Sequence, residues 1–179
     1  MKKLIIAIFA ISLAGLASAD TKDKPTKSPV TVSNLSKAAL TGLQLSVKKG
    51  VLDEKVTTET SACVAGLKAS SFNSIYEPMV REIFTTEEEE EVEEFFKSDV
   101  GEKYAKYGLL QIYVSVGLPP PEELPTLSER ELNEVEKFSK TSGGEKLMIK
   151  HSFQTLEANS AVQTRIHELL TSCGHVDKV

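Results

Sequence analysis

The chain has 179 residues with 21 basic and 26 acidic side chains, a formal net charge of −5, and 40% of its residues are hydrophobic. An acidic chain without a basic stripe repels phosphate backbones, so its charge argues against a nucleic-acid partner. A chain of this length forms one ordinary domain that can bury enough apolar surface to fold without a metal.

The N-terminus carries the pattern of a secretory signal peptide. Lys2 and Lys3 precede an apolar run over 4–16, and the small residues Ala-Ser-Ala follow it, ending at Ala19. This pattern predicts a signal peptide over 1–19, cleavage after Ala19 and a periplasmic product. The run is too short to cross a membrane as a helix, so we expect no membrane insertion after signal removal.

The next segment, 20–33, is rich in lysine, threonine and proline and shows no apolar periodicity, so we expect a flexible leader. A single helical domain is predicted over 34–179. Its first helix begins near Asn34 and ends before Gly50, and its second starts at Asp53. Its third covers 72–84, and Pro78 either kinks it or begins its last part. No long stretch alternates with period two, which predicts an all-α fold.

A phrase of the sequence occurs twice. VEEFFKSDVGEKY at 92–104 returns 43 residues later as VEKFSKTSGGEKL at 135–147. Each copy follows a capping box, in which a hydroxyl residue stands three positions before a glutamate. The boxes are Thr85 with Glu88 and Ser128 with Glu131, and further cap-like pairs are Asp99 with Glu102 and Ser142 with Glu145. We therefore predict two helix-corner-helix units, 84–116 and 127–173, joined by a proline-rich linker over 117–126.

Each predicted corner contains a glycine in the first turn of its second helix. Such a glycine costs about 1 kcal/mol relative to alanine, so its repetition indicates a close approach of two backbone segments. We expect a phenylalanine to pack over each bend and the second helix to fold back antiparallel. The corner residues are Phe95, Gly101 and Lys103 in the first copy, and Phe138, Gly144 and Lys146 in the second.

The last helix is predicted to run from 143 to 172, which would bring Cys173 back to Cys63 on the second helix. These are the two cysteines of the chain, and an exported protein meets an oxidising compartment, so we predict a disulfide. A loop of that size gives about 4 to 5 kcal/mol of stabilisation by chain entropy. The predicted fold is a compact all-α helical bundle closed by this disulfide.

Within 75–104 a set of residues forms a recognisable pattern: Pro78, Phe84, Thr85, Glu88, Phe95, Ser98, Gly101 and Lys103. In these residues the segment resembles a secreted bacterial family catalogued as domain of unknown function 2059, which has a proline-containing helix followed by F-T-x-x-E and F-Y-x-S-P-x-G-x-K. Phe96 and Asp99 depart from the pattern. The resemblance implies a small exported helical domain with no assigned reaction.

The densest charge feature is a run of glutamates over 87–94. Several of them repel one another at i,i+4 spacing, so we expect either a plain solvated helix face or a face that binds a cation or a basic protein partner. The spacing matches no calcium-binding loop. The candidate binding residues are Glu87, Glu89, Glu90, Glu93 and Glu94.

Two further clusters have a structural and a functional interpretation. Small residues at 141–144 can cradle an anion with their amides near Lys146, or they can simply cap a helix. His167, Cys173, His175 and Asp177 have metal-ligand chemistry, but using Cys173 for a metal would leave Cys63 unpaired. We therefore predict no metal and no cofactor.

The sequence contains no catalytic motif, so we predict no catalytic residue. The leading hypothesis is a non-catalytic binding or interaction protein of the cell envelope, with an inhibitor or immunity protein as one form of it. The alternative is an envelope hydrolase that uses paired carboxylates. A structural or chaperone-like role is a third hypothesis, for which a large exposed apolar groove would be the sign.

Overall fold

The computed structural model describes residues 29–174, and within them all regular secondary structure is helical, as the sequence predicts. The predicted signal peptide, 1–19, lies outside the described residues. The α-helices are α1 (Val30–Leu52), α2 (Thr58–Ala65), α3 (Asn73–Ile83), α4 (Thr86–Lys97), α5 (Asp99–Ser115), α6 (Glu129–Ser139), α7 (Ser142–Gly144) and α8 (Leu156–Ser172). Short 3₁₀ turns, η1 (Ala69–Phe72) and η3 (Ser152–Gln154), and a π-helical turn, η2 (Glu145–Ile149), complete the set.

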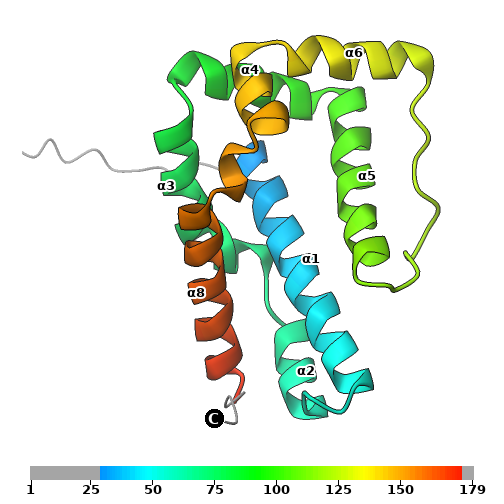
Figure 1. The fold of residues 1–179 in the computed structure, drawn as a ribbon, viewed down its shortest axis with the longest axis vertical. Helices are drawn as coiled ribbons and strands as arrows, with labels where there is room; N and C mark the ends of the chain where they lie inside the picture. The colour runs from blue at the N-terminus through cyan, green and yellow to red at the C-terminus, as the bar shows by residue number, and fades with distance from the viewer. Residues whose placement is uncertain (1–28, 175–179) are drawn as a thin grey trace, which may run out of the picture.

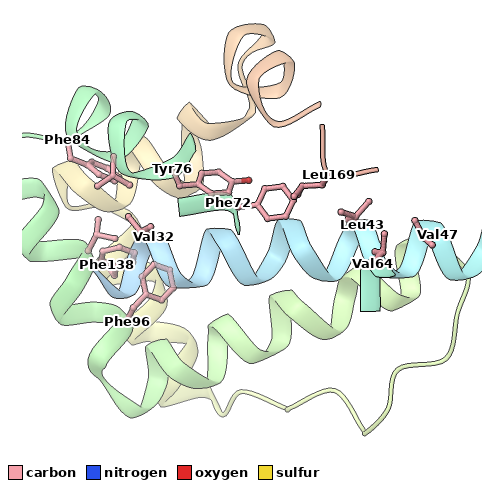
Figure 2. Close-up of a cluster of buried hydrophobic side chains, with 12 residues drawn as sticks. Val32, Leu43, Val47, Val64, Phe72, Tyr76, Phe84, Phe96, Phe138 and Leu169 are labelled. Carbon is pink, nitrogen blue, oxygen red and sulfur yellow. The ribbon is translucent and has the colours of Figure 1, made fainter. Parts of the chain in front are cut away.

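The long helix α1 is the axis of the fold. It runs down the middle of the molecule with α8 and α5 on either side, while α4 and α6 cross the top (Figure 1). The core forms along α1, where its buried side chains meet aromatic residues from the rest of the chain (Figure 2). The core includes Val32, Leu43, Val47, Val64, Phe72, Tyr76, Val80, Phe84, Val92, Phe96, Phe138 and Leu169.

The folded domain starts earlier than predicted. Helix α1 begins at Val30, and both Thr31 and Val32 are buried, so the expectation of a flexible leader is wrong for the end of 20–33. The side chain of Glu93, more than 60 residues away, accepts hydrogen bonds from the first amides of α1. Such a partner, distant in sequence, has no signature in the local pattern.

The connection from α1 to α2 also differs from the prediction. Helix α1 continues through Gly50 to Leu52, and α2 starts at Thr58, where the hydroxyl of Thr57 accepts from the amide of Thr60. Gly50 is needed for a close approach rather than for a cap. A Cβ at this position would lie 2.6 Å from Cγ2 of Val56.

The predicted continuous helix from 143 to 172 is broken. After η2 the chain turns at His151, which has a left-handed φ of 50°, and α8 starts afresh with Thr155 as its N-cap. The break places Leu156 at the start of α8 with 85% of its surface exposed. The apolar residues before and after His151 have the spacing of one continuous helix in the sequence, but the turn at His151 separates the two segments.

The predicted disulfide is present. Cys63 on α2 and Cys173 after α8 are joined with a Cα–Cα distance of 5.6 Å, across 110 positions of sequence. The bond ties α8 to the early part of the bundle. In the part of the chain that the structure describes, no helix combines the length and the apolar character needed to cross a membrane.

Candidate functional site

Both copies of the repeated phrase form the same tight corner. The hydroxyl of Ser98 accepts from the amide of Gly101 at 3.0 Å, and Thr141 caps Gly144 in the same way at 3.1 Å. The caps therefore stand one residue before the predicted ones at Asp99 and Ser142, because the capped amide is that of the glycine. A Cβ on either glycine would lie under 2 Å from a carbonyl oxygen of the preceding helix, so the predicted close approach is confirmed.

The second helix of a unit does not fold back on the first. Ser98 ends α4 and also caps α5, so a single residue joins the two helices. An antiparallel helical hairpin needs a loop of about two to five residues. Helix α5 instead turns away from α4 and runs down the molecule next to α1 (Figure 1).

The two corners meet face to face. The rings of Phe95 and Phe138 stack with their centroids 3.9 Å apart and their planes 4° from parallel. These residues occupy the same position in the two copies of the phrase. A contact between one residue and its own equivalent is characteristic of a two-fold relation, so the two units pack around a local pseudo-two-fold axis near this stack.

The corner lysines, Lys103 and Lys146, reach across this axis to the cap glutamates, Glu88 and Glu131. Lys103 donates to both carboxylate oxygens of Glu131 at 2.9 Å. Lys146 donates to Glu88 at 2.5 Å and to the carbonyl of Ile83 at 2.9 Å. The lysine of each copy thus neutralises the capping box of the other copy.

This exchange sets the ionisation of the cap glutamates. The hydrogen bond from Lys146, followed by those from Ser142 and the Thr85 amide, lowers the pKa of Glu88 from 4.5 to about 2. The hydrogen bond from Lys103, followed by that from the Ser128 amide, lowers the pKa of Glu131 to about 2. Both carboxyl groups are therefore held ionised and cannot deliver a proton at neutral pH.

Helix α4 divides its glutamates between the inside and the outside of the molecule. Glu88 is only 8% exposed, and Glu91 accepts from the amide of Gly143 at 3.0 Å. Glu93 accepts from the amides of Val30 and Thr31 at 2.9 and 2.7 Å. Burial alone would raise the pKa of Glu93, but these hydrogen bonds outweigh it and lower the pKa. Its carboxylate caps α1, so the prediction that Glu93 belongs to an open binding face is wrong.

The remaining predicted residues of α4 face outward. Glu87, Glu90 and Glu94 are exposed, and their i, i+3, i+7 spacing places them on one side of the helix, which we call the outer stripe. Glu89 is half-buried.

The duplicated helix α6 supplies a comparison that the sequence analysis missed. At the positions equivalent to the outer stripe it carries Arg130, Asn133 and Lys137, all exposed. The fold therefore accommodates basic and neutral side chains at these positions, and it does not require the acidic ones. Shifting the sequence by its own repeat length would have revealed this difference.

The small residues at 141–144, which could cradle an anion or cap a helix, bind acidic side chains of the protein itself. The hydroxyl of Ser142 donates to Glu88, and the amide of Gly143 donates to Glu91. The anions held by this segment are thus two carboxylates of α4. The prediction assigned Gly144 and Lys146 to the corner, and the structure places both residues there.

The residues with metal-ligand chemistry near the C-terminus, for which we predicted no metal, do not form a cluster among the described residues. Cys173 is in the disulfide, His175 and Asp177 lie outside the part of the chain that the structure describes, and no group of three metal-ligating side chains occurs within that part. Two apolar hollows lie beside α1: a groove of about 470 Å³ between α1 and α8, and one of about 150 Å³ between α1 and α5.

Among residues 29–174, several carboxyl groups have a pKa below the ordinary value, as a result of hydrogen bonds to amides, hydroxyls or lysines. These groups belong to Glu59, Glu87, Glu88, Glu93, Glu131 and Glu136.

The fold and the paired corners define the chain as an all-α, disulfide-closed domain built from two related helix-corner-helix units. No protein-family model, curated protein or solved structure matches it. The resemblance of 75–104 to domain of unknown function 2059 therefore stays a prediction.

Proposed function

We propose that the protein is an exported, non-catalytic binding protein of the bacterial cell envelope, and that the outer stripe of α4 engages a basic protein. The observation that carries this proposal is the contrast between α4 and its duplicate α6. The outer positions of α4 bear three glutamates, whereas the same positions of α6 bear Arg130, Asn133 and Lys137.

Packing does not account for the acidic stripe. Glu87, Glu90 and Glu94 are exposed, and like charges on one helix face are mildly destabilising. The helix dipole favours only the first of them, at the N-terminus. A complementary basic surface would remove the repulsion, and opposite charge across an interface accelerates encounter and selects partners. An inhibitor or immunity protein that covers a basic effector is the form of binding that fits this surface.

The hydrolase alternative has less support. A glycosidase needs one carboxyl group with a raised pKa that can donate a proton to the leaving group. The inner glutamates of α4 instead accept hydrogen bonds from helix N-termini and from a lysine, and the pKa values of Glu88 and Glu93 are lowered. The apolar groove between α1 and α8 has no acidic residue in its lining.

Affinity capture from envelope extract tests the proposal, with the natural chain and two exchanged chains as baits. The first exchanged chain carries the α6 residues on α4: Glu87→Arg, Glu90→Asn and Glu94→Lys. The matched control carries glutamate at all three equivalent positions of α6. We expect mass spectrometry to find a basic protein with the natural chain and with the control, and to lose it with the first exchange.

The outcome that contradicts the proposal is equal recovery of the same proteins by all three baits. Capture in low and in moderate salt adds a second criterion. Binding through exposed charges weakens as the Debye length shortens, whereas apolar binding does not. A captured protein that is insensitive to salt would therefore be bound elsewhere.

A further inference from the structure

An apolar groove lies away from the outer stripe, on the side of α1 next to α8. It has a volume of about 470 Å³. Gly42 and Ser46 of α1 contribute small side chains, Ile166 and Leu170 of α8 contribute larger apolar ones, and Val116 after α5 lies at its rim. A hollow of this size, with mainly apolar lining and few polar groups, is typical of sites for small organic ligands.

Helix α8, which lines one side of the groove, is held in place by links to other segments. Helix α8 packs mainly on α3, α2 and η3 rather than along α1. The Cys63–Cys173 disulfide fixes its end to α2, and Arg165 donates to the carbonyl of Ser71 at 2.9 Å. These links fix the position of α8 beside the groove.

The lining determines what kind of group can be buried. It includes no charged side chain, and its polar side chains are those of Ser46 and Gln163. A charge in such a place would lose hydration without gaining a partner, so the buried part of a ligand must be apolar. Residues 39–47 of α1 line the groove over about 12 Å at the helical rise per residue, which suits an extended chain rather than a compact ring system.

A lysine side chain, that of Lys49, lies at one end of the groove. The ammonium of Lys49 donates to the carbonyl of Val116, at the rim of the groove, with a distance of 3.3 Å. Lys49 is exposed, and an ammonium has three donors. Although the chain is acidic overall, distant exposed charges are screened beyond about 8 Å at physiological ionic strength, so the charges near the groove matter most, and Lys49 is bonded directly to a residue of the groove.

We propose that the groove binds the alkyl chain of a single-chain amphiphile with an anionic head group, and that Lys49 pairs with the head. The shared chemistry is that of a fatty acid or an anionic lysophospholipid. This inference goes beyond the proposed function because it concerns a different surface. Loss of protein capture by the exchanged stripe and loss of amphiphile binding are therefore separate results.

Titration of the purified mature chain with dodecanoate, followed by calorimetry, is the test. We expect saturable binding at one site and weaker binding of dodecyltrimethylammonium, whose chain is the same and whose head is positive. Lysophosphatidylglycerol in a parallel titration distinguishes the sources: tighter binding than dodecanoate indicates a lipid head, and weaker binding indicates a free fatty acid. Absence of saturable binding by all anionic amphiphiles overturns the proposal, and so does self-association or peptide binding through the groove in their place.

Two matched pairs of variants locate the site. Gly42→Leu puts a large apolar side chain in the groove lining, and its Cβ would meet only Cγ2 of Ile112, at 4.0 Å, so the Cβ itself displaces no neighbour. Gly108→Leu is the control, since its Cβ meets nothing within 4 Å and it lines the smaller hollow instead. We expect Gly42→Leu to abolish dodecanoate binding and Gly108→Leu to leave it unchanged, with thermal midpoints confirming that both are folded. Equal binding by the two variants, or the reverse order, overturns the assignment.

The second pair tests the head group. An exposed ion pair contributes little, so Lys49→Gln should weaken dodecanoate binding by about threefold to fivefold. Lys48→Gln, a neighbouring exposed lysine that does not contact the groove rim, should have no effect. Both variants should bind the uncharged dodecyl maltoside equally. An equal effect of the two substitutions on dodecanoate contradicts the role of Lys49.

Discussion

The corner glycines give the sharpest stability prediction. In Gly101→Ala the new Cβ would lie 1.8 Å from the carbonyl oxygen of Phe95, although real Cβ contacts are at least 3.0 Å. The oxygen would have to move by about 1.2 Å, and it accepts from the amide and the hydroxyl of Ser98 at 3.0 and 2.7 Å. Loss of these hydrogen bonds costs about 1 kcal/mol each, and overpacking costs about 1 to 3 kcal/mol.

The higher helix propensity of alanine offsets part of this destabilisation, by about 1 kcal/mol relative to glycine. The net loss in the free energy of unfolding is then about 2 to 4 kcal/mol, measured by urea unfolding with far-ultraviolet circular dichroism. Gly144→Ala should behave alike, since its Cβ would lie 1.9 Å from the carbonyl oxygen of Phe138. Gly108→Ala is the control and should be neutral or stabilising, because nothing lies near its Cβ. If Gly101→Ala matches Gly108→Ala, the tight corner does not exist.

Three other predictions concern the links between distant segments. Replacing Cys63 and Cys173 with serine should lower the free energy of unfolding by about 4 to 5 kcal/mol, as measured by urea unfolding, while the helical signal persists. The cap glutamates stabilise the fold above their unfolded pKa of 4.5, and this contribution should fade as the pH falls toward about 2. The urea midpoint should therefore fall over this pH range, and it should depend less on pH in the variant with Lys103→Met and Lys146→Met. Glu93→Ala should accelerate hydrogen exchange at the amides of Val30 and Thr31, and unchanged exchange would refute the cap.

The parts of the fold that the sequence predicted are those with a local signal. The capping boxes at Thr85 and Ser128 form as expected, because a hydroxyl residue and a glutamate three positions apart need only each other. The disulfide followed from the predicted compartment and the number of cysteines. The repeated glycine was correctly interpreted as a close approach, because only glycine fits such a contact.

The features that the sequence did not predict depend on partners far along the chain. Glu93 appeared to be one more surface glutamate, but the fold brings it to the start of α1. The corner lysines bond to the opposite copy, which no local pattern specifies. Phe95 and Phe138 were each expected over their own bend, and the structure instead stacks them on each other. The inner glutamates of α4 differ from the outer ones because they make contacts of this long-range kind.

The division of the α4 glutamates into an inner structural set and an outer binding set is tested most directly by the urea midpoint of the stripe-exchanged chain. Replacing the outer stripe with the residues of α6 should lower the midpoint only slightly, through the loss of the first-turn interactions of Glu87, because α6 tolerates those residues at the equivalent positions of the same fold. A loss of stability as large as that caused by Glu93→Ala would mean that the outer glutamates serve the fold, and the case for a basic partner at this surface would fail.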